Sequence, residues 1–267
     1  MIVQRPTRRL RSSVKAAYST FASYKPAREL SVCHGDLCLE PGVESALLST
    51  PLRQIPFRLL CEYTWALTGS DCKKLNADEI RHFRPRYFQF ISHGLWPNFS
   101  GDWPPTLRAL GSFSHRENWP SNEVEVIDEF FDALLQQMLL RPIGWSTRKD
   151  GSPIPYTDVD ELMCTMAIAG GDTKRLIAEW SQNLIGTGLQ HVAALIDDCE
   201  RGQNLGIMRG SLPSAWWDYR SADATILKAW LYRTEIAYVL DHAAQEESDP
   251  LTKELFARSS EAVLTAP

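Results

Sequence analysis

A short segment near the N-terminus brings together two thiols and an imidazole. Cys33, His34 and Cys38 lie within six residues, and both residue types are ligands that Zn²⁺ accepts. Tetrahedral zinc takes four ligands, so a fourth would have to come from elsewhere, the candidates being His82, His93 and Cys72. The same residues also fit a redox pair or a loop whose cysteines do no chemistry. Because the spacing supplies only three ligands, we favour the loop, and zinc is the one cofactor that the sequence suggests.

A second group of residues could perform acid–base chemistry. His82 follows Asp78 and Glu79 within the segment DEIRHFRPR, which also holds three arginines. An imidazole beside carboxylates can act as a general acid or base, and the arginines could bind an anion. A capped helix start followed by solvated ion pairs explains the same residues with fewer assumptions, and we favour it. The chain has no HExxH, P-loop, GxSxG or CxxC signature, so we assign no catalytic residue.

Tryptophans are frequent in the predicted loops. The chain has nine, and Trp96, Trp103 and Trp145 all lie in loop-like sequence. Aromatic side chains in loops indicate either loop packing or a recognition surface. Since few basic residues lie between these rings, they favour a protein partner over a nucleic acid.

The elements that must position these groups are predicted to be almost all helical. Apolar residues recur at intervals of three and four, and no stretch alternates as a strand would. We expect an all-α fold, an irregular array of about ten helices with no regular repeat. The expected helices cover residues 10–24, 41–48, 56–69, 76–92, 106–110, 121–141, 158–169, 172–180, 187–200, 222–232, 233–246 and 250–264. Pro85 should kink the fourth of these or break it after Phe83.

The domain organisation follows from loop composition. Residues 144–156 are rich in Gly, Ser, Pro and charged residues, which is typical of a loop. This loop is the one candidate for an internal boundary. We expect residues 1–267 to form a single helical domain.

Charge is distributed unevenly along the chain. Residues 1–30 carry a net charge of +6, whereas the whole chain carries −5, so the remainder carries about −11. A basic, acid-poor start resembles a mitochondrial presequence, but a basic first helix packed through its apolar face explains it equally and is favoured. No apolar stretch of the length of a signal peptide or a membrane span is present. We therefore expect a water-soluble cytoplasmic protein that binds neither membranes nor nucleic acids, with its cysteines packed as reduced thiols.

Three phrases in combination suggest a family. STPLR at residues 49–53, RHF-PR at 81–86 and AIAGGD at 167–172 resemble a group of all-helical bacterial proteins that are mostly uncharacterised. The resemblance spans roughly residues 18–245. It implies bacterial origin and an association with secreted-toxin gene clusters. In that family a closely spaced cysteine pair precedes the STPLR helix, whereas Cys33 and Cys38 are separated by four residues, and no catalytic residue is carried over.

These observations lead to three hypotheses about function. The first is a protein-binding module, most concretely a cytoplasmic immunity protein that binds and neutralises a basic secreted toxin. An acidic chain with aromatic loops fits it, because opposite charge accelerates association. The second is an enzyme with an acid–base site around His82. The third is a metal-dependent or redox-responsive regulator that uses Cys33, His34 and Cys38.

Overall fold

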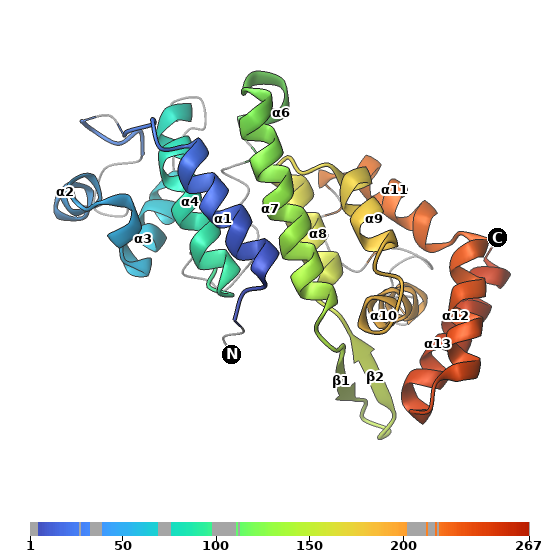
Figure 1. Cartoon of the computed structure of the whole chain (residues 1–267). Helices are drawn as coiled ribbons and strands as arrows, with labels where there is room; N and C mark the ends of the chain where they lie inside the picture. The colour runs from blue at the N-terminus through green and yellow to red at the C-terminus, as the bar shows by residue number, and fades with distance from the viewer. Residues whose placement is uncertain are drawn as a thin grey trace. The chain divides into compact units, whose positions relative to one another are not determined.

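The computed structural model describes residues 5–26, 28–32, 39–68, 76–97, 111, 113–201, 212, 217 and 219–266. These residues form twelve α-helices, one short 3-10 helix and one two-stranded sheet (Figure 1). The predicted all-α fold class is confirmed. No helix of the described residues is long and apolar enough to cross a membrane. The expected helix at 106–110 lies outside the described residues.

Contacts between residues divide the chain into two compact units. The first unit is Met1–Leu134 with Ile168–Gly171, and the second is Leu135–Ala167 with Asp172–Pro267. The division passes through two helices and not through the segment 144–156. That all residues make one domain stays a prediction.

The first unit is built around α1 and α4, which pack against each other. Its elements are α1 (Arg8–Thr20), α2 (Pro41–Ser49), η1 (Leu52–Gln54), α3 (Phe57–Thr68), α4 (Ala77–Ser92), α6 (His115–Asn118) and most of α7 (Ser121–Leu139). The basic helix α1 buries Leu10, Val14 and Ala17, so the expected apolar face exists. Phe88 of α4 stacks on Phe130 of α7 with ring centroids 3.8 Å apart.

Helix α4 runs through its proline without a break. Asn76 caps the helix, its side chain accepting from the N–H of Asp78 at 2.9 Å. Pro85 lies inside the helix, where it removes one backbone hydrogen bond. Because Pro85, Phe83 and Phe88 are all buried, packing of this helix offsets the lost bond. The alternative of a break after Phe83 is therefore wrong.

The second unit is a helical layer around a buried central helix, α10. Its elements are the end of α7, β1 (Gly144–Thr147), β2 (Pro153–Tyr156), α8 (Val159–Ile168), α9 (Thr173–Ser181), α10 (Thr187–Arg201), α11 (Ser221–Leu231), α12 (Thr234–Glu246) and α13 (Pro250–Thr265). Helix α13 packs on both α10 and α12. The hydroxyl of Ser259 donates to the carbonyl of Ala193 at 3.0 Å, and that of Ser260 donates to Ala237 at 2.9 Å. Small residues at these positions allow the three helices to approach closely.

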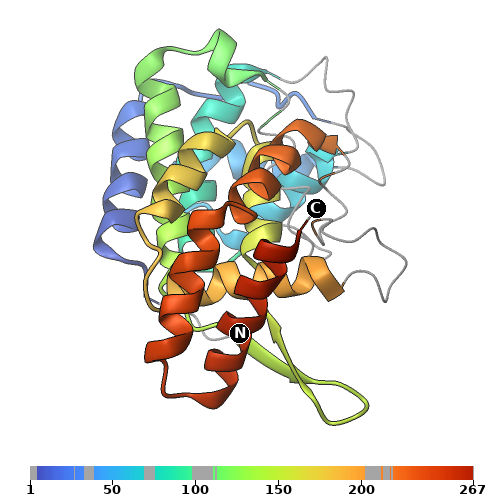
Figure 2. The same cartoon turned by 90° about the vertical axis from the view of Figure 1, so that its right-hand side faces the viewer.

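The segment predicted to be a loop at 144–156 forms a β-hairpin. β1 and β2 pair antiparallel, with Trp145 opposite Pro155 and Thr147 opposite Pro153. The turn closes through Gly151, whose φ of +86° suits the left-handed position of a three-residue hairpin loop. Figures 1 and 2 show the hairpin projecting from the helices of the second unit. Strands of four residues are too short to give a clear alternating pattern, which is why the sequence indicated a loop.

Candidate protein-binding surface

Helix α12 carries apolar residues on two faces. One face packs against α13 and buries Ile236, Leu240 and Ala244. On the other face Tyr238 is 67% exposed and Val239 is 37% exposed. Burial of the first face explains why α12 packs onto α13, whereas the apolar side chains of the second face do not contribute to the core.

The loop between α9 and α10 exposes a third large apolar side chain. Ile185 is 80% exposed, although its loop is held firmly on both sides. The indole N–H of Trp180 donates to the carbonyl of Gly188 at 3.0 Å, and the hydroxyl of Thr187 donates to the carbonyl of Leu139 at 2.7 Å. The side-chain amide of Asn183 donates to the carbonyl of Glu179 at 2.8 Å. These three hydrogen bonds fix the loop, so the side chain of Ile185 stays exposed to solvent.

These two elements enclose an open groove of about 530 Å³. The residues that line it are Leu184, Ile185, Gly186, Leu189, Tyr238, Val239, His242, Ala243 and Glu246. We call this the α10–α12 groove. All of its residues belong to the second unit. A groove with exposed apolar walls is typical of a binding site for another protein. Elsewhere on protein surfaces exposed apolar side chains are usually scattered singly, whereas contiguous ones mark interaction sites.

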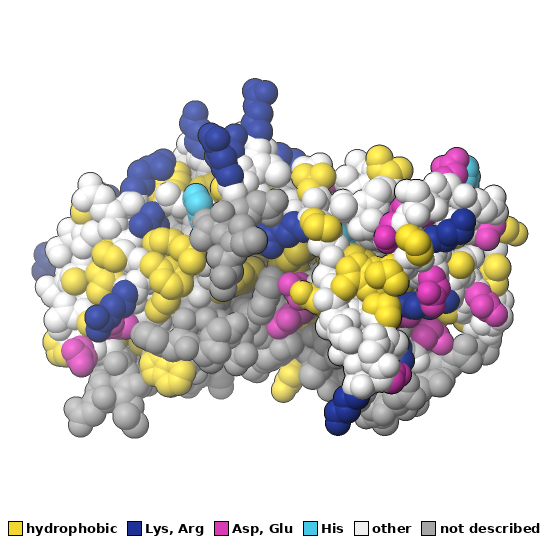
Figure 3. All heavy atoms as spheres, turned by 90° about the horizontal axis from the view of Figure 1, so that it is seen from below, with side chains coloured by type: hydrophobic (Ala, Val, Ile, Leu, Met, Phe, Trp, Pro, Cys, Tyr) yellow, Lys and Arg dark blue, Asp and Glu magenta, His cyan; other side chains and the backbone are white. Residues whose placement is uncertain are grey.

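Helix α12, which forms one wall of the groove, carries more acidic than basic side chains, and Glu246 lines the groove. The exposed charged side chains of α12 are Glu235, Asp241 and Glu246, and between residues 234 and 246 there is no lysine or arginine. His242 lies 3.8 Å from the carboxylate of Glu246. In the view of Figure 3, acidic, basic and hydrophobic side chains are interspersed over the elements of the second unit. The groove therefore combines apolar walls with negative charge, which suits a basic partner surface.

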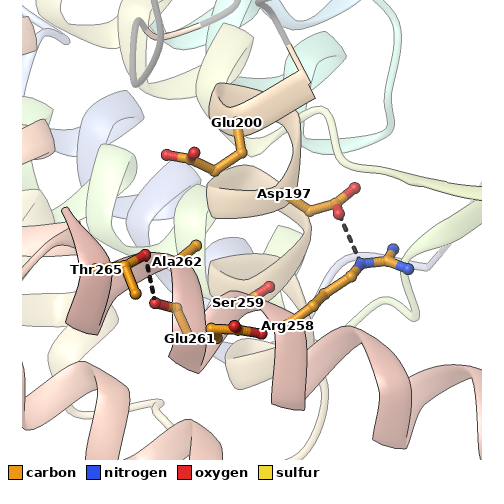
Figure 4. A pocket seen from close by; sticks show the side chains of 7 residues that line it. All are labelled: Asp197, Glu200, Arg258, Ser259, Glu261, Ala262 and Thr265. Atoms are coloured by element: carbon orange, nitrogen blue, oxygen red, sulfur yellow. Dashed lines mark hydrogen bonds and ion pairs between the residues drawn. The ribbon is translucent and has the colours of Figure 1, made fainter.

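A smaller pocket between α10 and α13 is lined mainly by polar groups. Its volume is about 280 Å³, and Figure 4 shows Asp197 paired with Arg258 across it. Asp197 also pairs with Arg201 at 2.6 Å, and Glu200 accepts a hydrogen bond from the hydroxyl of Tyr232 at 2.7 Å. Of these contacts, the Asp197–Arg258 pair joins α10 to α13.

The predicted metal ligands Cys33, His34 and Cys38 lie outside the described residues, as does Cys72. Among the residues that the structure describes, no group of three or more His, Cys, Asp or Glu could hold a metal ion. Three other cysteines are buried thiols, as expected: Cys61, Cys164 and Cys199. Burial raises the pKa of the Cys61 thiol to about 11, so this thiol stays protonated and unreactive.

The three acid–base candidates have separate structural roles. His82 donates from Nδ1 to the carbonyl of Tyr24 at 2.9 Å, and burial lowers its pKa. Asp78 is an exposed first-turn acid paired with Arg81 at 2.8 Å. Glu79 is 1% exposed and accepts from the hydroxyl of Tyr63 at 2.7 Å. Their hydrogen bonds lead to different partners, so the geometry does not favour a shared acid–base site.

The expectation that the arginines of this segment are solvated is wrong for Arg84. Arg84 is 1% exposed, and its guanidinium lies 4.5 Å from the centre of the Trp119 ring. Burial lowers its pKa to about 9, and the neighbouring charge of Arg81 adds to this effect. His115 is also 1% exposed, and among the described residues neither of its ring nitrogens has a hydrogen-bond partner. This cluster forms the interior of the first unit and not a solvated helix face.

The predicted tryptophan surface is separate from the groove. Trp103 lies outside the described residues. Trp96 and Trp145 are both half-buried, and they belong to different units. Neither lines the α10–α12 groove, so their role in binding stays a prediction.

The sequence contains a pattern that predicts the groove, and it lies outside the tryptophan-containing loops. Tyr238 and Val239 fall outside the buried stripe of α12, and Leu184 and Ile185 stand between two helices where polar residues are usual. Apolar residues on a second helix face, combined with an apolar connecting loop, would have indicated an exposed surface.

Comparison of the chain with protein-family models, with curated proteins and with solved structures finds no match.

Proposed function

We propose that this protein acts by binding another protein through the α10–α12 groove. The observation that carries the proposal is the exposed apolar wall formed by Ile185, Tyr238 and Val239. Burying one such side chain in an interface contributes about 1.5–3 kcal/mol. Exposure of three of them around one groove has a cost in solubility that a binding role explains.

The charge of helix α12 supports a basic partner over a second copy of this chain. Glu246 lines the groove, and helix α12 also carries the exposed acids Glu235 and Asp241, with no lysine or arginine between residues 234 and 246. A second copy of this chain would place these acids against themselves, and like charges in an interface disfavour association. A partner with basic residues around an apolar patch complements the groove in both respects.

The most concrete form of this function is a cytoplasmic immunity protein that neutralises a basic secreted antibacterial toxin. The acidic character of helix α12 supports it, and the phrases STPLR, RHF-PR and AIAGGD are the basis for expecting a bacterial protein encoded near toxin genes. In this role the chain would hold the toxin in the cell that makes it and block its active surface. Complexes of this type reach the tightest affinities known among proteins, with Kd values of about 10⁻¹³ to 10⁻¹⁶ M.

A protection assay tests this proposal. A candidate basic toxin is expressed in cells with and without this protein. We expect the wild-type chain and the control Leu264→Glu to restore growth, and Ile185→Glu to fail. Leu264 is an exposed leucine of α13 outside the groove, so it matches the change in chemistry. Equal growth with and without the wild-type chain contradicts the immunity role, and full protection by Ile185→Glu contradicts the groove.

A further inference from the structure

The two edges of the β-hairpin differ in their hydrogen-bonding capacity. In an antiparallel pair, residues alternate between positions that bond across the ladder and positions whose N–H and C=O point away from it. The backbone N–H of Arg148 donates to the carbonyl of Ser152 at 2.8 Å, so these two residues form a hydrogen-bonded pair of the ladder. The register then places Trp145 opposite Pro155, and Thr147 opposite Pro153, at outward-pointing positions.

The outer edge of β2 is closed. Its two outward positions are Pro153 and Pro155, and proline has no N–H to donate. The carbonyl of Pro155 is also occupied, because Arg201 of α10 donates to it at 3.0 Å. Prolines and covering side chains are the devices by which proteins protect sheet edges from pairing.

The outer edge of β1 carries no such protection. Its outward positions are Trp145 and Thr147, each with an N–H and a C=O, and within the described residues neither makes a backbone bond outside the hairpin. Thr147 is exposed and Trp145 half-exposed. The strand itself, GWST, has no charged side chain. Figures 1 and 2 show that the hairpin projects from the helices of its unit.

We propose that the β1 edge pairs with the β1 edge of a second copy of this chain, giving a four-stranded antiparallel sheet across a two-fold axis at Ser146. In this register Trp145 of one copy lies opposite Thr147 of the other, and both exchange their outward N–H and C=O groups. The tip charges do not meet, because Arg148 falls opposite Gly144 of the second copy. The edge is therefore complementary to itself, whereas the acidic α10–α12 groove is not.

The size of this contact sets its strength. Stable interfaces bury about 1,200 Å² or more, and two four-residue strands joined by four backbone bonds bury less. The self-association is therefore weak and depends on concentration. It uses a different surface from the α10–α12 groove, so it neither requires nor excludes the proposed partner.

The test is sedimentation equilibrium of the full chain over a concentration series up to about 1 mM. Thr147→Pro removes one outward N–H, as the prolines of β2 do, and leaves the ladder bonds of the hairpin in place. Thr147→Val keeps the N–H and serves as the matched control. Circular dichroism and thermal unfolding check that both variants fold as the wild type does.

We expect a wild-type dimer whose fraction rises with concentration, a similar dimer for Thr147→Val, and at least a tenfold weaker dimer for Thr147→Pro. Amide exchange at Trp145 and Thr147 should slow as the wild-type concentration rises. A wild-type chain that stays monomeric throughout overturns the proposal. A dimer that Thr147→Pro leaves unchanged, with exchange at these two amides unaffected, overturns it as well, because the copies would then associate elsewhere.

Discussion

The indole N–H of Trp180 donates to the carbonyl of Gly188 at 3.0 Å, and this bond holds the loop that presents Ile185 to solvent. Trp180 is fully buried, so the loop is tied to the core of the second unit. Gly188 approaches the carbonyl of Asn183 so closely that an added Cβ would lie 1.9 Å from that oxygen. The loop that carries Ile185 is thus held by two residues that do not line the groove.

Gly188→Ala should destabilise the protein by about 2–4 kcal/mol, because the new methyl group would overlap backbone that cannot move aside. Gly42→Ala is the control, since no atom lies within 4 Å of the added Cβ, and it should change stability by less than about 1 kcal/mol. Urea unfolding measures both. Equal stability of the two variants would show that the loop is not held at Gly188.

Trp180→Phe should lower the free energy of unfolding by about 1–3 kcal/mol, because the carbonyl of Gly188 loses its donor and the smaller ring leaves a cavity. It should also weaken partner binding although Trp180 contacts no partner. Amide exchange in residues 182–188 is the direct readout. Unchanged exchange there would contradict the anchoring role of Trp180.

Glu79 is predicted to be structural. It accepts hydrogen bonds from the hydroxyl of Tyr63 at 2.7 Å and from the N–H of Ser31 at 2.9 Å. Glu79→Leu leaves both donors buried without this acceptor and should cost about 2–4 kcal/mol, whereas Tyr63→Phe should cost about 1–2 kcal/mol. A double-mutant cycle by urea unfolding should show coupling between the two. Additive effects would mean that the Glu79–Tyr63 bond contributes nothing to stability.

His115 should make the protein less stable in acid. Burial, together with the charges of Arg84 and Arg116, lowers the pKa of His115 to about 3. The unfolded chain then binds a proton below about pH 6.5 while the folded chain does not, so stability is lost as pH falls from about 6.5 towards 3. The loss is at most about 1.4 kcal/mol per pH unit.

The variant His115→Gln isolates this contribution. Urea unfolding at pH 7 and pH 5 should show a smaller difference for His115→Gln than for the wild type. His93→Gln is the control, because that imidazole lies at the exposed end of α4. An identical pH dependence of His115→Gln and the wild type would show that His115 is protonated in the folded protein.

The helices could be predicted because their apolar spacing is dictated by burial of one face. Asp172 begins the expected helix over 172–180, and in the structure it is the N-cap of α9, its carboxylate accepting from the N–H groups of Lys174 and Arg175. The hairpin could not be recognised in this way, because only the turn at Asp150 and Gly151 carried a local signal. Its strands are fixed by packing on α10 through Arg201, a contact 46 residues away in sequence.

The candidate site was harder to predict than the fold. Loop tryptophans were the predicted binding residues. Tryptophan content is a poor indicator of a binding surface in this chain, because Trp180 and Trp230 pack against each other in the core. Arg84 is buried although its sequence context indicated a solvated face. The α10–α12 groove depends on which of two apolar faces of α12 is covered by α13, and composition does not contain that information.

Affinity purification from the native host tests the central claim most directly. Tagged wild type, Ile185→Glu and Leu264→Glu are compared, and the proteins retained in stoichiometric amount are identified and weighed by mass spectrometry. We expect one basic protein to be retained by the wild type and by Leu264→Glu, and retention by Ile185→Glu to fall by about tenfold or more, since each 1.4 kcal/mol is a factor of ten in affinity. The absence of any stoichiometric partner, or equal retention by all three chains, would contradict the account.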